Sequence, residues 1–137
     1  MDAVYTAVVT ANGRDGRAAS DDGHLDVRLA FPPALGGDGQ GTNPEQLFAA
    51  GYAACFATSM QLVAQQQKID VSGMSVTAEV GLVPNGRGGF KLEVTLRTKL
   101  PPSLPREAGR ELIEATHQVC PYSNATRGNI QVELLVE

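Results

Sequence analysis

No segment of the sequence concentrates basic residues, and the chain carries a formal charge of −4 from 11 basic and 15 acidic residues. A nucleic acid's phosphate backbone binds clustered positive charge, so no nucleic-acid partner is expected. No apolar run reaches the ~20 residues that span a bilayer. The first 17 residues lack a basic start followed by an apolar segment, so no secretory signal is expected either. These absences predict a cytoplasmic protein that does not enter a membrane.

Cysteine and histidine are also scarce. The sequence has two cysteines, Cys55 and Cys120, and two histidines, His24 and His117. Their spacing matches no recognised zinc pattern, so no metal site is expected. In a reducing compartment a cysteine pair is more often catalytic or redox-active than structural. Each cysteine taken alone is equally compatible with a small buried apolar residue.

The composition is ordinary for a globular protein, with 42% hydrophobic and 19% charged residues. A chain of 137 residues predicts a single domain, residues 1–137, with a substantial core. Five segments alternate apolar and polar residues with a period of two, which predicts half-buried strands. These segments cover residues 5–10, 25–29, 74–82, 90–96 and 130–136. The glycine-rich segment 84–89 predicts a hairpin loop between the third and fourth strands.

A long helix is predicted between the second and third strands. Asn43 suits the N-cap, Pro44 the first helical position and Glu45 the positive end of the helix dipole. The helix is expected to continue to about Lys68. Residues 47–59 carry no charge, which predicts burial nearly all round.

A second helix is predicted to start near Pro105 and to stop or bend at Pro121. Apolar residues recur along it at helical spacing, and Cys120 shares their face. The expected stripe consists of Ala108, Leu112, Ala115 and Val119. The order of the elements predicts an α+β domain with a mostly antiparallel sheet.

Two long motifs around the cysteines resemble those of the organic hydroperoxide resistance (Ohr) proteins, in the Ohr/OsmC family. The first runs TNPEQLFAAGY from Thr42 and leads to Cys55, and the second runs VCPYSNATRGN from Val119. The segment GRDGR at residues 13–17 is similar to the one that carries the family's active-site arginine. The similarity extends from about Tyr5 to Val136, nearly the whole chain.

The resemblance implies the Ohr/OsmC fold, with mostly antiparallel sheets packed on a long buried central helix in an intertwined homodimer. Its active sites would lie at the subunit interface. Cys55 would be the peroxidatic cysteine, Cys120 the resolving cysteine and Glu45 the acidic partner of an arginine. That arginine maps to Arg14, with Arg17 as the alternative. The sister OsmC branch shares the fold and the chemistry, and the second motif favours the Ohr branch.

The implied activity is the reduction of organic hydroperoxides in oxidative-stress defence. A guanidinium beside Cys55 would stabilise its thiolate, and Glu45 would hold that arginine bidentately. The sulfenic acid formed on Cys55 would condense with Cys120 into a disulfide. A dithiol would reopen it, and the resemblance implies dihydrolipoamide on a lipoylated protein, with no bound cofactor. The rival readings are an OsmC-branch peroxidase and a non-enzymatic redox sensor.

Apolar side chains near Cys55 could line a pocket for alkyl or fatty-acyl hydroperoxides, although they would serve a core equally well. The candidates are Phe48, Tyr52, Phe56 and Met60. His117, three residues before Cys120, could act as its base, but it lies beside the apolar stripe rather than on it.

The spacing of Glu45 and Cys55 bears on the dimer. On one continuous helix, ten residues separate them by ~15 Å along the axis. An antiparallel crossing of two such helices would bring one chain's Glu45 toward the other chain's Cys55. We therefore expect each site to take Cys55 and Cys120 from one chain and Glu45, with Arg14, from the other. The crossing would use the small residues Ala49, Ala50, Gly51, Ala53 and Ala54.

Overall fold

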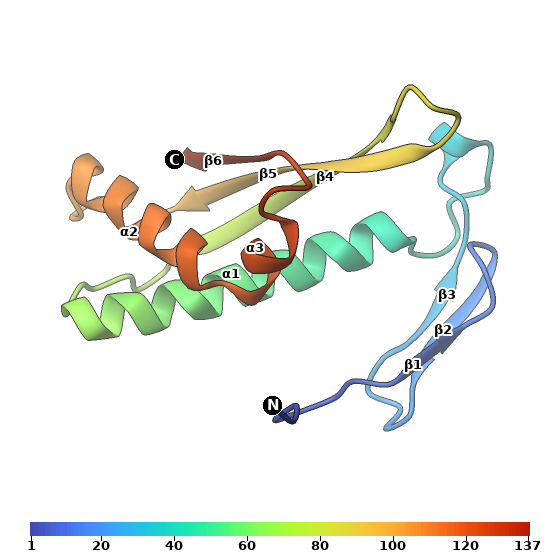
Figure 1. The fold of residues 1–137 in the computed structure, drawn as a ribbon, viewed down its shortest axis with the longest axis horizontal. Helices are drawn as coiled ribbons and strands as arrows, with labels where there is room; N and C mark the ends of the chain where they lie inside the picture. Colours follow the sequence, from blue (N-terminus) through green and yellow to red (C-terminus); the bar gives the residue numbers. More distant parts are fainter. The chain divides into compact units, whose positions relative to one another are not determined.

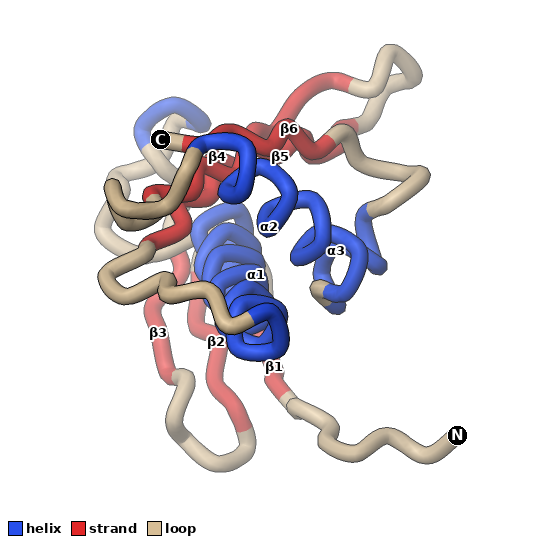
Figure 2. The backbone as a smooth tube through the Cα atoms, turned by 90° about the vertical axis from the view of Figure 1, so that its left-hand side faces the viewer, coloured by secondary structure: helices blue, strands red, loops and turns tan.

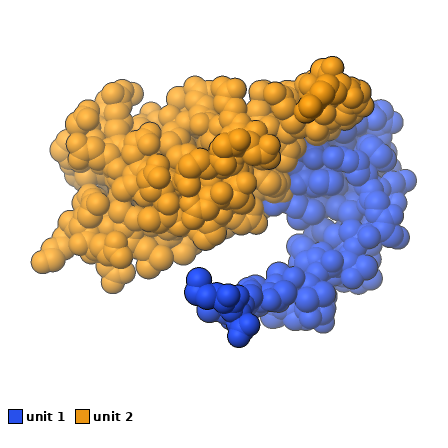
Figure 3. Space-filling view, viewed as in Figure 1, with its two compact units in different colours: residues 1–47 blue, residues 48–137 orange.

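The computed structural model describes residues 1–137, which form two compact units, Met1–Leu47 and Phe48–Glu137 (Figure 3). Each unit contains one three-stranded sheet. Helix α1 (Pro44–Gln67) begins in the first unit and continues through the second. The predicted α+β class is confirmed. Whether the two units together form the single domain that the sequence predicts is not decided by their separate descriptions, so the single domain stays a prediction.

The first unit is an antiparallel meander of β1 (Val9–Ala11), β2 (Gly16–Ser20) and β3 (Asp26–Leu29), followed by the short helix η1 (Pro33–Leu35) (Figure 1). The predicted strand at residues 5–10 forms only at its end. Strand β2 was not predicted, because its sequence GRAAS has no apolar alternation. It becomes a strand because it pairs with β1 on one side and β3 on the other.

The second unit contains β4 (Ser75–Pro84), β5 (Phe90–Lys99) and β6 (Val132–Val136). Strands β4 and β5 form the predicted hairpin, and β6 pairs with β5 in parallel. The Asn85 side chain accepts from the backbone N–H groups of Arg87 and Gly89, which closes the hairpin loop. Parallel pairing requires a crossover connection, and the chain makes it through two helices between β5 and β6.

Helix α1 has the predicted bounds. The Asn43 side chain accepts from the Gln46 N–H at 2.8 Å, as an N-cap does. Lys68, just beyond the end, has a positive φ of 58°. The expected burial of residues 47–59 nearly all round is wrong for this chain by itself, because Ala50, Ala54 and Thr58 are exposed.

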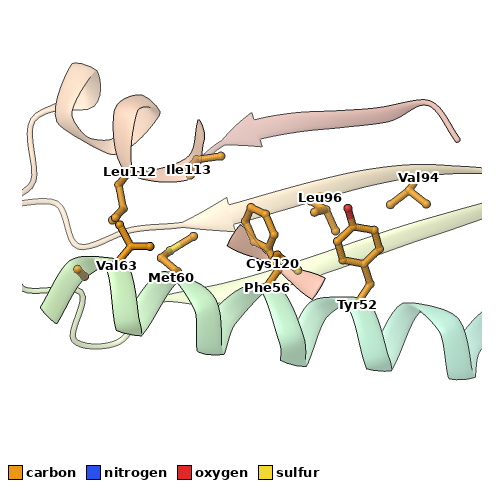
Figure 4. Close-up of a cluster of buried hydrophobic side chains, with 10 residues drawn as sticks. Tyr52, Phe56, Met60, Val63, Val94, Leu96, Leu112, Ile113 and Cys120 are labelled. Atoms are coloured by element: carbon orange, nitrogen blue, oxygen red, sulfur yellow. The ribbon is translucent and has the colours of Figure 1, made fainter. Parts of the chain in front are cut away.

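The buried face of α1 packs against the sheet of the second unit (Figures 1 and 2). Its side chains meet Val94 and Leu96 of β5 and, toward the end of the helix, Leu112 and Ile113 (Figure 4). The helix contributes Tyr52, Phe56, Met60, Val63 and Ala64. Burying one such large side chain contributes about 1.5–3 kcal/mol, so this cluster fixes α1 against the sheet.

By length and composition alone α1 could also cross a membrane, since it has 24 residues and a mean hydropathy of 1.4 over its most apolar window. The expectation that no segment reaches this length is therefore corrected. The core helix of a soluble protein meets the same criterion. Tyr52, Phe56 and Met60 are fully buried here, which is the pattern of a core helix.

Helices α2 (Arg106–Val119) and α3 (Pro121–Thr126) connect β5 to β6. The predicted start of α2 at Pro105 is confirmed, but its buried face is shifted. Gly109, Leu112, Ile113 and Thr116 are buried, whereas Val119 is 53% exposed. Helix α3 was not predicted, because Pro121 was read as a stop. Proline also suits the first position of a new helix, and it has that position here.

Candidate active site

The two cysteines lie together in the second unit. Cys55, on α1, is partly exposed, and Cys120, between α2 and α3, is fully buried. Both are free thiols. Cys120 is close enough to Cys55 to influence its ionisation directly. The structure therefore pairs the two residues that the sequence analysis selected, although they are 65 positions apart.

The surroundings of Cys55 favour its protonated form. Burial raises the pKa of the Cys55 thiol, and the neighbouring Cys120 thiol raises it further. The backbone N–H of Tyr122, in the first turn of α3, lowers this pKa. All of these groups belong to the second unit, and none of them carries a positive charge.

Cys55 lines a pocket of ≈360 Å³ in the second unit. Its other walls combine apolar side chains with a few polar groups, namely Thr58, Ser59, Leu62, Val63, Gln66, Val119 and Pro121. Pockets of this size and character suit small organic ligands. The partly exposed thiol is therefore presented to an apolar space.

The predicted pocket lining is corrected by this arrangement. Tyr52, Phe56 and Met60 are fully buried in the core, and Phe48 packs edge-on against Tyr52 and Tyr122. None of the four lines the pocket beside Cys55. Helical spacing counted from Cys55 would have found the α1 residues that do, because positions three, four, seven, eight and eleven further on share its face.

Arg14 and Glu45 form a bidentate ion pair within the first unit. The two guanidinium nitrogens of Arg14 lie 2.8 and 2.9 Å from the two carboxylate oxygens of Glu45. Glu45 raises the pKa of the Arg14 guanidinium through this hydrogen bond. The predicted contact between these two residues is present, and it fixes both ends of the arginine fork.

Arg17, the alternative arginine, has a different partner. It binds Asp26 on the neighbouring strand β3, with both contacts at 2.6 Å. This pair is far more exposed, at 65% and 48% of the side chains, against 31% and 16% for Arg14 and Glu45. The geometry therefore separates the two arginines and favours Arg14.

A buried set of hydrogen bonds joins the three helices behind the cysteines. The Ser123 hydroxyl of α3 lies 2.8 Å from the Tyr52 hydroxyl of α1 and 2.8 Å from Nδ1 of His117 on α2. Burial lowers the pKa of His117, and the charge of Arg127 lowers it further. The sequence analysis considered His117 only as a base for Cys120, and it did not anticipate the hydrogen bond of His117 to Ser123.

No group of three or more histidine, cysteine, aspartate or glutamate side chains is arranged to hold a metal ion. The expectation of no metal and no bound cofactor stays a prediction.

Known proteins are closely similar to this chain. The family model for OsmC-like proteins matches residues 37–135. An organic hydroperoxide resistance protein of Xanthomonas axonopodis pv. citri is 52% identical, covering 96% of this chain and 93% of that protein. The OhrB protein of Bacillus subtilis is 48% identical, covering 96% and 97%.

Solved structures agree with these relatives. The organic hydroperoxide resistance protein of Legionella pneumophila superposes with a TM-score of 0.94 at 47% identity, covering 99% of each chain. The extent of these matches confirms the resemblance in the two cysteine motifs. The chain belongs to the OsmC-like family and, within it, to the organic hydroperoxide resistance proteins.

Proposed function

We propose that this protein is a two-cysteine peroxidase that reduces organic hydroperoxides to alcohols in the cytoplasm. The observation that carries the proposal is the pairing of a partly exposed Cys55, in an apolar pocket, with a fully buried Cys120. One thiol can meet a substrate while the other is shielded from it. The names of the relatives, which refer to hydroperoxide resistance, support the same substrate class.

The chemistry follows from this asymmetry. The Cys55 thiolate attacks one peroxide oxygen, the O–O bond breaks, and the departing alkoxide takes a proton to become an alcohol. Cys55 is then a sulfenic acid. The Cys120 sulfur attacks the Cys55 sulfur, water leaves, and a disulfide forms. An external dithiol reduces that disulfide by exchange and is itself oxidised to a disulfide.

The first step needs a thiolate, and the second unit by itself favours the thiol of Cys55. A guanidinium beside the sulfur would reverse this preference and stabilise the departing alkoxide. Arg14 is the candidate, because Glu45 already holds it in a bidentate pair. We assign the positive charge to Arg14 and its orientation to Glu45.

We further propose a homodimer in which Arg14 and Glu45 of one chain complete the site formed by Cys55 and Cys120 of the other. The ten-residue separation of Glu45 and Cys55 along α1, ~15 Å, argues against a single-chain site. The exposed small residues Ala50 and Ala54 could contact the partner helix. Gly51 is removed from the predicted crossing, because Tyr122 of the same chain occupies the space beside it.

The reductant is proposed to be a lipoyl dithiol on a carrier protein. An apolar pocket at Cys55 could accept the hydrocarbon chain of a lipoyl group as well as that of a hydroperoxide. A large thiol protein would instead require a broad docking surface around the cysteine. The choice between reductants is therefore open to a direct kinetic test.

The test is steady-state turnover of tert-butyl hydroperoxide with dihydrolipoamide or with thioredoxin as the reductant, and hydrogen peroxide as the comparison substrate. We expect multiple turnovers with dihydrolipoamide, and a higher kcat/KM for the organic peroxide because only it gains apolar contact. Faster turnover with thioredoxin would contradict the proposed reductant. A single oxidation with no turnover under either reductant would contradict the enzyme and favour a redox sensor.

A further inference from the structure

The short helix α3 lies beside Cys55, since its first residue, Pro121, lines the same pocket as Cys55. Cys120 immediately precedes this helix, and the backbone N–H of Tyr122 in its first turn lowers the pKa of the Cys55 thiol. A helix of 6 residues has no stable position of its own. Its placement must therefore come from contacts with the neighbouring helices.

Ser123 makes the central contacts of α3. Its side chain is fully buried, and its hydroxyl lies 2.8 Å from both the Tyr52 hydroxyl and Nδ1 of His117. Tyr52 belongs to α1, the helix of Cys55, and His117 belongs to the last turn of α2. One hydroxyl therefore connects all three helices that surround the cysteine pair.

Two further contacts reinforce this arrangement. The Thr126 hydroxyl lies 3.3 Å from that of Tyr52 and donates to the carbonyl of Ser123 at 3.2 Å. Arg127 donates to the His117 carbonyl at 2.5 Å and to the Asn124 side chain at 2.8 Å. The buried hydroxyls of Tyr52, Ser123 and Thr126 are all satisfied by one another and by His117. Leaving any one without its partner would carry the cost of an unpaired buried polar group.

We propose that Ser123 is a positioning residue of the active site, since by bridging Tyr52 and His117 it holds α3 beside Cys55. The set of Tyr52, Ser123, His117 and Thr126 is here called the Ser123 bridge. It acts through Tyr122 and Cys120 and touches no substrate. This role rests on the proposed peroxidase function. The reactivity of Cys55, which the Ser123 bridge would control, can nevertheless be measured without peroxide.

The physical consequence concerns the thiolate of Cys55. An N–H group that faces a sulfur stabilises the thiolate more than the thiol, so losing its alignment disfavours ionisation. Ser123→Ala removes both hydrogen bonds and leaves Tyr52 and His117 without their shared partner. We expect the reaction of Cys55 with iodoacetamide at neutral pH to slow by about threefold to tenfold, since one pKa unit corresponds to a tenfold change in thiolate.

The experiment follows alkylation at Cys55 by peptide mass spectrometry as a function of pH in the full-length protein. Ser123→Ala and His117→Leu should both move the rate profile to higher pH. His117→Asn places a polar atom near the position of Nδ1 and should restore most of the wild-type profile. If Ser123→Ala does not fold, Tyr52→Phe removes a hydroxyl from the same bridge and should shift the profile in the same direction.

Thr116→Ala is the matched control. Thr116 is also fully buried, but its hydroxyl donates only to the Leu112 carbonyl within α2. It should lower the melting temperature without moving the alkylation profile. An unchanged profile for Ser123→Ala and Tyr52→Phe, or an equal shift for Thr116→Ala, would overturn the proposal. Neither result depends on peroxide turnover, so the bridge and the proposed function can fail independently.

Discussion

The two units of the chain differ in what holds them together. The second unit encloses a continuous cluster of ten buried residues, including Cys120, and packs Cys55 against it. In the first unit the buried apolar residues are only Ala18, Leu29 and Ala30, while Tyr5 is 77% exposed. A three-stranded sheet with so little core is not expected to be stable alone. The cysteines thus belong to a unit with a continuous core, whereas the Arg14–Glu45 pair belongs to a unit with few buried apolar residues.

The largest effect is expected from the cysteines of the second unit. Cys55→Ser should abolish peroxide consumption, because the attacking sulfur is lost. Cys120→Ser should react once and then accumulate the Cys55 sulfenic acid, detected by mass spectrometry after chemical trapping. If Cys120→Ser blocked the first reaction while Cys55→Ser remained reactive, the two roles would have to be exchanged.

A smaller loss should separate the two arginines of the first unit. Arg14→Ala should lower kcat/KM for tert-butyl hydroperoxide by about 10²-fold, the usual effect of losing one group that stabilises developing charge. Arg17→Ala should leave kcat/KM unchanged, because its pair with Asp26 is exposed. Equal losses for both variants would remove the distinction that the two ion pairs suggest.

The proposed sharing of each active site between two chains should give a twofold change in activity. A mixed dimer of one Cys55→Ser chain and one Glu45→Ala chain concentrates both defects in one site if the sites are shared. The other site is then intact, and about half of the wild-type activity should remain in the purified heterodimer. Near-complete loss would show instead that each site is built within one chain.

The free energy of unfolding should show the same contrast between the two units, independently of any catalytic activity. Leu112→Ala, in the core of the second unit, should lower the free energy of unfolding by about 2–5 kcal/mol. Val9→Ala, on the first sheet, should change it by less than about 0.5 kcal/mol, because Val9 is already 47% exposed. Urea denaturation of both variants tests this. A large loss for Val9→Ala would mean that another surface covers this residue in solution.

The sequence predicted those parts of the structure that local rules determine. Asn43 and Pro44 marked the start of α1, and the two long motifs identified the cysteines and Glu45. Strand β2 and helix α3 were missed, because β2 exists through its two neighbours and α3 through the contacts of Ser123. The sequence also did not predict which face of α1 packs against the sheet. In a helix without charge from residue 47 to 59, the sequence pattern does not separate Tyr52 in the core from Ala54 on the surface.

Gly51 shows how one missing methyl group can let two helices approach closely. A Cβ at this position would lie only 2.8 Å from Cζ of the Tyr122 ring, so any larger residue would push that ring away from α1. Glycine within a helix costs about 1 kcal/mol relative to alanine, and here that cost is linked to a close approach of α3. Position 51 is thus a natural point for changing the distance between α1 and α3. Graded enlargement of this one residue would move the segment that follows Cys120 outward in small steps without altering any cysteine or any charge.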